Sequence, residues 1–258
     1  MKRLPLVFVH GAGGVGRGWD LQVLAFPWAL APDLPGHGSE PGPACGRIVD
    51  YAAWLHRLLH GRRVTPAVLA GHSMGGAVAL QYALDYPEDV LGLVLIATGP
   101  RLRVAPQILA DLRRDYPSAV RGIVGRSLAP GASPRLAARL VGTMGAVPPE
   151  VTLADFEACD AFDVSSRLEE VRAAALVIVG DEDRMTPLRL SATLSARLPR
   201  AELVVIPGAG HMVHAEKPQL VNRAIARFLD RMAASPGPGV GQESPPAGRN
   251  NGSRAEAH

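Results

Sequence analysis

A serine placed between a strand and a helix constrains this chain most. Residues 67–80 read Ala-Val-Leu-Ala-Gly-His-Ser-Met-Gly-Gly-Ala-Val-Ala-Leu, which is an apolar run, a G-x-S-x-G pattern and then a series of good helix formers. So tight a turn strains its central residue and brings its flanks close together, and Gly71 and Gly75 leave room because they have no Cβ. The pattern predicts that Ser73 is a nucleophile held above a sheet, with the Met74 amide pointing to where an oxyanion would form.

A glycine-rich loop near the start of the chain offers further backbone amides. Leu4 to Val9 is a continuous apolar run, typical of a strand that is buried on both faces of a parallel sheet. It is followed by His-Gly-Ala-Gly-Gly-Val-Gly over residues 10–16. A phosphate-binding loop is disfavoured, because the G-K-[ST] sequence and the ribose-binding acid of the two nucleotide motifs are absent. We expect the Ala12 amide to form an oxyanion hole together with the Met74 amide.

Strands and helices alternate along most of the chain, and this alternation predicts an α/β fold with a doubly wound, mostly parallel sheet of about six strands. Between the two loops we expect a strand from Trp28 to Asp33 and a helix from Ile48 to His60. The remaining expected elements are strands over Val90–Ala97, Ala174–Gly180 and Glu202–Ile206, a helix with Thr186 as N-cap and Pro187 as first residue, and a last helix from Pro218.

The strand rhythm stops between residues 99 and 173. This stretch has a helical pattern punctuated by prolines, and such an insertion between strands usually forms a lid over the site or extra scaffold. We therefore expect a core over 1–98 and 174–234, a helical lid over 99–173 inserted after the fourth strand, and a tail over 235–258. The tail is rich in Pro, Gly, Ser and Asn, which predicts disorder.

The charges of the expected lid are segregated along the sequence. Residues 100–145 contain eight arginines and two aspartates, whereas residues 150–170 contain seven acids and one arginine. Charge runs on helices are usually solvated or paired, so we expect these two halves to pair with each other. The alternative is that some of the arginines face the pocket, where their field would favour substrates or carriers with negative charge.

The composition argues against several classes of function. An apolar fraction of 47% and a charged fraction of 20% are typical of a globular protein, and no apolar run is long enough to span a membrane. The net charge is +3, but the basic residues form no stripe with interleaved aromatics, which argues against nucleic acid as a partner. Cys45, Cys159 and eight scattered histidines show no disulfide or metal-ligand spacing, so we expect a cytoplasmic protein without a metal.

Ser73, Asp183 and His211 occur in this order, each in a loop after an expected strand, and the chain thereby resembles the α/β-hydrolase family and its serine esterases. The motifs that carry the resemblance, over roughly Leu4 to Met232, are His10–Gly14, Gly71–Gly76, Gly180–Asp183 and Gly208–Glu216. The resemblance implies that Ser73 is the nucleophile, His211 the base and Asp183 the orienting acid. Asp181 is the alternative acid, disfavoured by its position in the motif. No metal or cofactor is implied.

Other residues of these motifs are expected to pack rather than to react. His72 and His214 resemble packing neighbours of the site, and His37 is expected to be a turn residue. Members usually carry two strands before the oxyanion strand, whereas this sequence starts almost on it. We therefore expect either six strands, as in the branch of plant esterases and hydroxynitrile lyases, or a true start upstream of Met1. The lyases of that branch place a lysine directly after the catalytic histidine. Met212 stands there instead, which argues against cyanohydrin cleavage.

The resemblance implies hydrolysis of a small carboxylic ester through an acyl-enzyme on Ser73. A serine at this turn argues against the dehalogenases and epoxide hydrolases of the fold, which use aspartate. The same constellation also serves hydrolases of carbon–carbon bonds, lyases of the menaquinone-synthesis type, esterases for methyl esters on an acyl carrier protein, and non-enzymatic ligand sensors. The expected partners are therefore a small ester and, for one of these alternatives, an acidic acyl carrier.

Overall fold

The central sheet has five strands, all of whose neighbours are parallel, in a computed structural model that describes residues 3–234. The expected disordered tail over 235–258 lies outside the described residues. The strands lie in the sheet in chain order: β1 (Leu6–Val9), β2 (Ala67–His72), β3 (Val90–Ile96), β4 (Ala174–Gly180) and β5 (Ala201–Ile206). The first four are almost wholly buried, which explains why their sequences are apolar throughout instead of alternating.

The expected strand over residues 28–33 is wrong, because this segment makes only a single bridge to the sheet. Leu30 lies beside β1, where its amide donates to the Leu6 carbonyl (2.9 Å) and its carbonyl accepts from the Phe8 amide (2.7 Å). Pro32 follows, and proline has no amide hydrogen with which to continue a ladder. The described sheet therefore has five strands where about six were expected.

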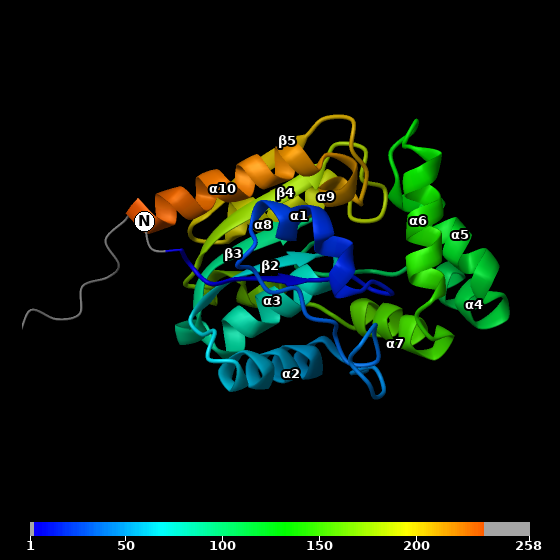
Figure 1. Cartoon of the computed structure of the whole chain (residues 1–258), viewed down its shortest axis with the longest axis horizontal. Coiled ribbons are helices and arrows are strands. Elements are labelled where there is room, and N and C mark those ends of the chain that lie inside the picture. Colours follow the sequence, from blue (N-terminus) through cyan, green and yellow to red (C-terminus); the bar gives the residue numbers. More distant parts are fainter. Residues whose placement is uncertain (1–2, 235–258) are drawn as a thin grey trace, which may run out of the picture.

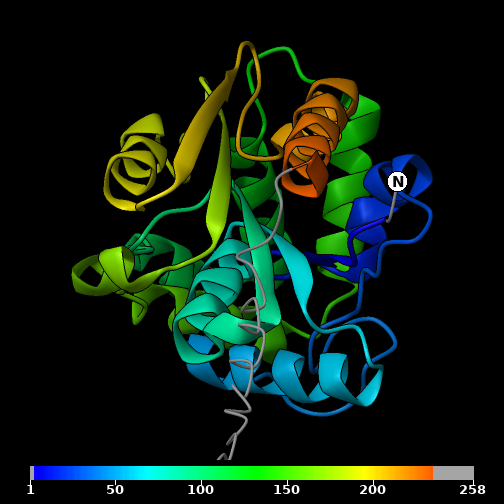
Figure 2. The same cartoon turned by 90° about the vertical axis from the view of Figure 1, so that its left-hand side faces the viewer.

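Helices cover both faces of the sheet, as Figures 1 and 2 show. One face carries α2 (Ile48–Gly61), α3 (Met74–Asp85) and α8 (Leu188–Arg197), whose apolar residues form one core with the strands. The other face carries α1 (Asp20–Ala25) and α10 (Pro218–Ala234), which form a second core. The predicted α/β fold with a parallel sheet between two helical layers is confirmed.

The long helices bury the faces that the sequence pattern predicts. In α10, Val221, Ile225 and Phe228 are buried at helical spacing while the intervening residues are more exposed. Because such helices are apolar on one side only, none within residues 3–234 is long and apolar enough to cross a bilayer. Three short helices complete the core: η1 (Gly16–Trp19), η2 (Pro87–Asp89) and α9 (Val213–Glu216).

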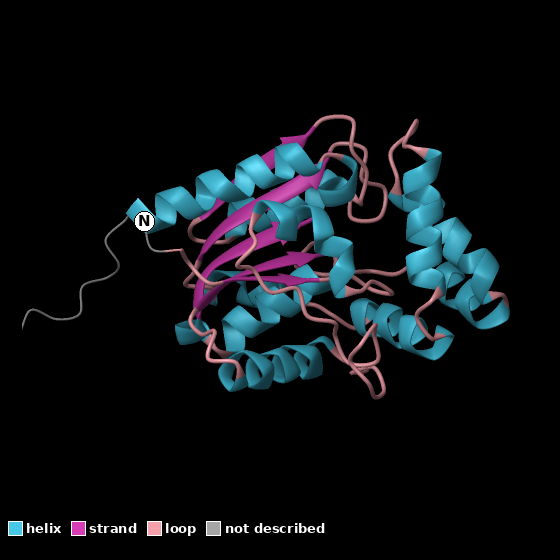
Figure 3. Cartoon of the chain, viewed as in Figure 1, coloured by secondary structure: helices cyan, strands magenta, loops and turns pink. Residues whose placement is uncertain are grey.

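The insertion, residues 99–173, is helical as expected. It forms α4 (Pro106–Arg114), α5 (Tyr116–Ser127), α6 (Pro134–Gly145), α7 (Pro149–Asp160) and the 3-10 helix η3 (Ser165–Glu170). Each of the four α-helices has a proline in its first turn, where the missing amide hydrogen costs no intrahelical bond. In Figures 1 and 3, α4, α5 and α6 stand beyond the carboxyl ends of the strands. The insertion follows β3, the third strand, and not a fourth strand as expected.

Candidate active site

Ser73 occupies the sharp turn between β2 and α3. Its φ of 52° and ψ of −116° lie outside the regions that L-residues ordinarily occupy. Two hydrogen bonds hold this strained conformation: the Ser73 amide donates to the Ile96 carbonyl (2.9 Å), and the Thr98 hydroxyl donates to the Ser73 carbonyl (2.8 Å). The turn requires glycines, because a Cβ on Gly71 would lie 2.1 Å from the Gly75 carbonyl oxygen. The residue that the sequence singled out therefore has the strained backbone that the motif predicts.

His211 and Asp183 follow β5 and β4 and meet at the carboxyl edge of the sheet. His211 Nδ1 lies 3.0 Å from Asp183 Oδ2, and both side chains are buried. Asp183 also accepts hydrogen bonds from the Met185 amide (2.8 Å), the Thr186 amide (2.8 Å) and the Thr186 hydroxyl (2.7 Å). Burial alone would raise the pKa of Asp183, but the imidazole and these donors outweigh burial and lower it below its ordinary value. An ionised carboxylate therefore faces the imidazole at neutral pH.

The loop after β4 agrees with one expectation and contradicts another. Asp181 is exposed and accepts from a backbone amide of the next loop, so the structure brings Asp183 and not Asp181 against His211. The expected N-cap is wrong, because Pro187 and not Thr186 caps α8. The Thr186 hydroxyl instead lies 2.7 Å from Asp183 Oδ2 and 3.2 Å from His211 Nδ1. Sequence reasoning missed this role, although an aspartate followed three residues later by threonine is a signal for such a local turn.

Ser73 and His211 line the same pocket, which has a volume of about 720 Å³. Its walls come from the loops after the strands and from apolar side chains of α4, α5 and α7. Ala12 lines it too, whereas Met74 is buried at the start of α3 and Asp183 is buried. The fold thus brings the expected nucleophile, the expected base and one expected oxyanion donor to a single cavity, with the expected acid in contact with the base.

The Ala12 and Met74 amides remain available for a ligand. Within residues 3–234 neither amide donates a hydrogen bond to another residue. Met74 is the first residue of α3, where the helix leaves its amides unpaired and its dipole favours negative charge. Next to Ala12, the Gly13 amide donates to Asp155 Oδ2 (2.8 Å), and this hydrogen bond to a residue of the insertion fixes the loop. Both amides are therefore held in place by neighbouring contacts, and within the described residues their N–H groups make no hydrogen bond that would compete with a ligand.

Asp155 of α7 is fully buried and ties the insertion to this loop. It also accepts hydrogen bonds from the Tyr51 hydroxyl and from His37 Nε2 (2.8 Å). Burial alone would lower the pKa of His37, but the Asp155 carboxylate outweighs burial and raises it. The ring of His10 packs against that of His37, with centroids 4.8 Å apart, and burial lowers the pKa of His10 to about 4. Sequence reasoning missed Asp155, since 142 positions separate it from Gly13.

His72 and His214 pack around His211, in keeping with the expected packing roles. The His72 ring centroid lies 4.7 Å from that of His211 and 4.4 Å from that of His214. His72 Nε2 donates to the His211 carbonyl (2.9 Å), whereas His214 Nδ1 is buried without a partner among the described residues. Burial lowers the pKa of His214 to about 3 and that of His72 well below its ordinary value. Both rings are therefore uncharged at neutral pH.

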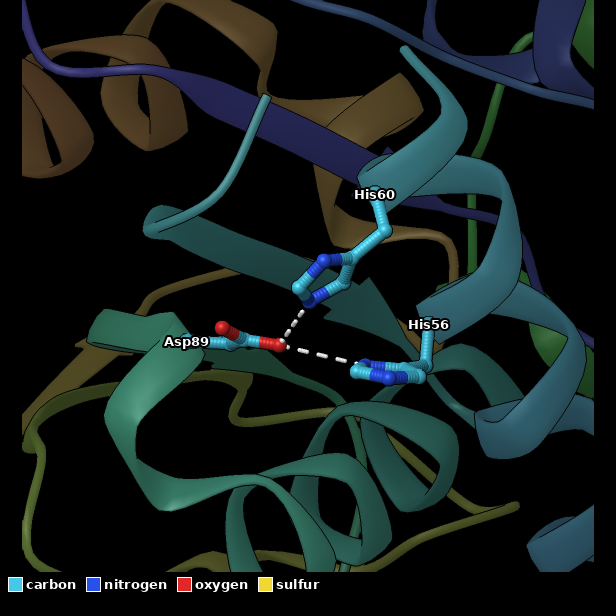
Figure 4. A group of neighbouring side chains, drawn as sticks. All are labelled: His56, His60 and Asp89. Atoms are coloured by element: carbon cyan, nitrogen blue, oxygen red, sulfur yellow. Dashed lines mark hydrogen bonds and ion pairs between the residues drawn. The ribbon is translucent and has the colours of Figure 1, made fainter. Parts of the chain in front are cut away.

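One group of side chains outside the pocket has the donors to hold a metal ion. Figure 4 shows His56 and His60 of α2 pointing at Asp89 of η2. His56 Nδ1 lies 3.1 Å and His60 Nε2 2.7 Å from Asp89 Oδ2. Sequence reasoning missed this group and found no ligand spacing, although the separation of His56 and His60 puts both on one face of a helix; Asp89 joins them through the fold. Cys45 and Cys159 are free thiols outside this group.

A serine, an aspartate and a histidine that follow three different strands are the arrangement shared by α/β hydrolases. The chain belongs to the alpha/beta hydrolase family, which it matches over residues 6–224. It is 28% identical to the putative carbamate hydrolase RutD of Caulobacter vibrioides, over 88% of this chain and 91% of that protein. It is 29% identical to the pimeloyl-[acyl-carrier protein] methyl ester esterase of Aromatoleum aromaticum, over 85% and 95%.

The solved structures agree with this assignment. A thermophilic esterase superposes with a TM-score of 0.82 at 33% identity, covering 90% of this chain and 91% of that chain. These relatives are named as hydrolases and esterases. We therefore class the chain as a hydrolase of the alpha/beta hydrolase family.

Proposed function

We propose that this protein hydrolyses carboxylic esters of small molecules, with Ser73 as nucleophile, His211 as general base and Asp183 as orienting acid. The observation that carries the proposal is the 3.0 Å contact between His211 and Asp183 beside the pocket that Ser73 lines. The names of two similar proteins, a methyl ester esterase and a thermophilic esterase, support ester chemistry.

The reaction begins with attack of Ser73 Oγ on the ester carbonyl. A serine hydroxyl is a weak nucleophile, so His211 takes its proton as the new bond forms. His211 then gives this proton to the leaving alkoxide, the alcohol departs, and an acyl group remains on Ser73. Water attacks that acyl group while His211 again acts as base, which releases the carboxylic acid. Asp183 stays ionised throughout, holds the imidazole in the required tautomer and stabilises the imidazolium.

The Ala12 and Met74 amides supply the oxyanion hole in this proposal. Negative charge develops on the carbonyl oxygen in each transition state, and preorganised donors in a cavity stabilise it more than water does. Loss of one such donor typically costs about 3 to 4 kcal/mol. That both amides are free of other hydrogen bonds within the described residues supports this role.

A carbamate is the second candidate substrate, favoured by the similarity to the putative carbamate hydrolase RutD. The same residues would attack its carbonyl. Electron donation from the carbamate nitrogen makes that carbonyl less electrophilic, so esters are the better substrates for this constellation unless the pocket binds the nitrogen specifically.

Turnover of p-nitrophenyl butyrate and of p-nitrophenyl N-methylcarbamate by the purified full chain tests both candidates. We expect ester hydrolysis that falls by about 1,000-fold or more in Ser73→Ala and in His211→Ala, with both variants folded. Ser195→Ala on α8 is the matched control and should keep wild-type activity. A folded Ser73→Ala variant with full activity would remove the proposed mechanism. Faster turnover of the carbamate would favour the second candidate, and no turnover of either by folded wild-type protein would favour a sensor.

A further inference from the structure

The pocket that Ser73 lines is rich in arginine and poor in acid. Five arginines contribute to its wall, and they are Arg101, Arg103, Arg126, Arg184 and Arg189. Among the described residues no aspartate or glutamate lines it, and Asp183 is buried against His211. An apolar cavity with one sign of charge at its wall concentrates ligands of the opposite sign.

The expected pairing between the two halves of the insertion neutralises little of this charge. Within residues 3–234 only two ion pairs join the two halves: Arg101 contacts Asp163 (3.3 Å), and Arg113 contacts Glu157. Hydrogen bonds from Ser165 are the largest cause that lowers the pKa of Asp163, and the nearby charges of Arg101 and Arg103 lower it further. The expected pairing therefore holds for Arg101 and Arg113 and does not extend to the remaining arginines of the first half within the described residues, so charge without an ion pair remains at the pocket.

Arg126, Arg184 and Arg189 have no ion pair within residues 3–234. Arg184 directly follows Asp183 in sequence, and the hydrogen bond that its side chain makes within residues 3–234 goes to the Leu128 carbonyl (3.0 Å). Arg126 precedes Ser127, whose carbonyl accepts from the backbone amide next to His211, that of Met212 (3.2 Å). Two guanidinium groups are thereby carried by segments next to the proposed catalytic residues, one adjoining Asp183 and the other contacting the neighbour of His211.

We propose that the substrate carries a carboxylate besides its scissile ester, and that Arg126 and Arg184 recognise this second group. The inference rests on the proposed ester hydrolysis and deepens it by naming a substrate class, small acids with one esterified carboxyl group. Guanidinium and carboxylate match in shape and form paired, charge-assisted hydrogen bonds. Because these arginines are exposed, their attraction is screened by salt over about 8 Å at physiological ionic strength.

The test compares p-nitrophenyl hydrogen adipate with p-nitrophenyl methyl adipate, in which a methyl ester at the far end replaces the charged carboxylate, and it follows release of p-nitrophenol from both. We expect kcat/KM to be about 3- to 10-fold higher for the anionic ester at low ionic strength, and this ratio to shrink at high salt. In the double variant Arg126→Gln, Arg184→Gln the ratio should approach one. Arg227→Gln, an exposed arginine of α10 away from the pocket, is the matched control and should keep the wild-type ratio.

The outcomes separate this inference from the proposed function. Equal kcat/KM values for the two esters, insensitive to salt, would overturn it while leaving ester hydrolysis intact. If neither ester is turned over, the proposed function fails, and calorimetry of both esters with Ser73→Ala still decides whether the anion binds more tightly. If turnover is fast only when the acyl group is attached to an acidic carrier protein, the proposal that the substrate is a small acid is overturned.

A second, independent inference comes from the group in Figure 4. Its three donor atoms lie within 4.8 Å of one another. Asp89 Oδ2 lies 3.1 Å from His56 Nδ1 and 2.7 Å from His60 Nε2, so a small outward shift would reach the roughly 3.3 Å between ligands of tetrahedral zinc. Neighbours hold two of the three side chains. His56 stacks on Tyr86 with centroids 3.8 Å apart, and Asp89 accepts from the Tyr82 hydroxyl (3.3 Å). Such outer contacts orient ligands before a metal arrives.

We infer that His56, His60 and Asp89 bind a divalent cation of the zinc type, with water completing the tetrahedron. The His60 side chain is 50% exposed, which gives solvent and the ion access. A bound ion would join α2 to η2 and would stabilise the folded chain, because the native arrangement brings the three donors together and binds the ion more tightly than the unfolded chain does. The group does not contribute to the pocket, so hydrolysis does not depend on it.

Titration of the tag-free full chain with zinc chloride tests this site. We expect one zinc ion per chain by calorimetry and a rise in Tm on zinc addition, both lost in His60→Ala and in Asp89→Asn. Arg57→Gln on the same helix is the control and should keep both. Retention of the zinc response in His211→Ala excludes the catalytic histidine as its source. An undiminished response in His60→Ala, or no response of the wild type, would overturn the site.

Discussion

The Gly13 amide and the Asp155 carboxylate form a 2.8 Å hydrogen bond that joins segments 142 positions apart. Asp155 belongs to the insertion, and Gly13 belongs to the loop that carries Ala12. The insertion therefore shapes the proposed oxyanion hole in addition to lining the pocket. The Tyr51 hydroxyl and His37 hold the same buried carboxylate, so it has little freedom to move.

Replacement of Asp155 by asparagine should lower kcat for ester hydrolysis by about 10- to 100-fold, because a small displacement of an oxyanion donor weakens transition-state binding. The neutral amide of asparagine is a weaker acceptor than a carboxylate for the donors that meet there. Steady-state kinetics with the butyrate ester measure the effect, and KM should change less than kcat. Glu157→Gln, at an exposed position of the same helix, should behave as wild type. An unchanged kcat in Asp155→Asn would contradict this coupling.

Thr186→Val should lower kcat by about tenfold while KM stays close to the wild-type value. The change removes a hydroxyl that donates to Asp183 Oδ2 at 2.7 Å, without changing side-chain volume much. A carboxylate with one donor fewer holds the imidazole of His211 less firmly. Thr193→Val on α8, whose hydroxyl donates to the Arg189 carbonyl of the same helix, is the comparison variant. Equal kcat values for the two variants would show that Thr186 does not support the pair.

The buried histidines predict a stability that falls as the pH drops from about 6.5 toward 4. His10, His72 and His214 have folded pKa values below the ordinary one, so the unfolded chain binds more protons in this range. Each of these histidines lowers the free energy of unfolding by about 1 kcal/mol for each pH unit of acidification in this range. His37 acts oppositely, since its raised pKa adds stability that is complete below about pH 6.5 and lost as the pH rises through its folded value.

Urea unfolding at pH 7, 6 and 5 measures this slope. Replacement of His214 by leucine removes one of the three titrating groups and a buried nitrogen without a described partner, so the slope should fall by about a third. An unfolding free energy that is constant between pH 7 and 5 in the wild type would contradict uncharged, buried histidines.

Gly75→Ala should destabilise the chain by about 3 kcal/mol or more, because its Cβ would lie 2.1 Å from the Val9 carbonyl oxygen and neither backbone can yield. Gly125→Ala in α5 is the matched change in open space, and it should raise Tm slightly since alanine favours a helix. Thermal unfolding of both variants measures the contrast. Similar Tm values would show that the turn around Ser73 tolerates a side chain.

The features with local signals were predictable from the sequence. The glycines around Ser73 announce a strained turn because only they fit it, and the insertion was recognisable from its prolines and helical pattern. Asp183 and His211 could be placed because each follows a buried strand in a motif. The geometry at these positions agrees with that interpretation, and their catalytic roles remain a proposal.

The features that depend on distant partners were not predictable. The strand expected around Leu30 is a different case, because Pro32, which interrupts its ladder after a single bridge, is visible in the sequence and was outweighed there by the apolar run. Asp155 looks like one of several acids on a helix until the fold buries it beside Gly13. Arg126 faces the pocket although nothing in its neighbourhood along the chain distinguishes it from the paired Arg113. Burial and facing are properties of packing, which a single sequence does not display.

The dispersal of the site along the chain has a practical consequence. His72, next to Ser73, touches the His211 carbonyl across 139 positions, and Gly13 reaches Asp155 across 142. The site needs contacts that span most of residues 12–211, so partly refolded molecules should lack turnover even when most of their helices have formed. Recovery of the proposed ester hydrolysis after dilution from denaturant should therefore report only the molecules in which sheet and insertion have closed together, so an activity assay would measure complete refolding.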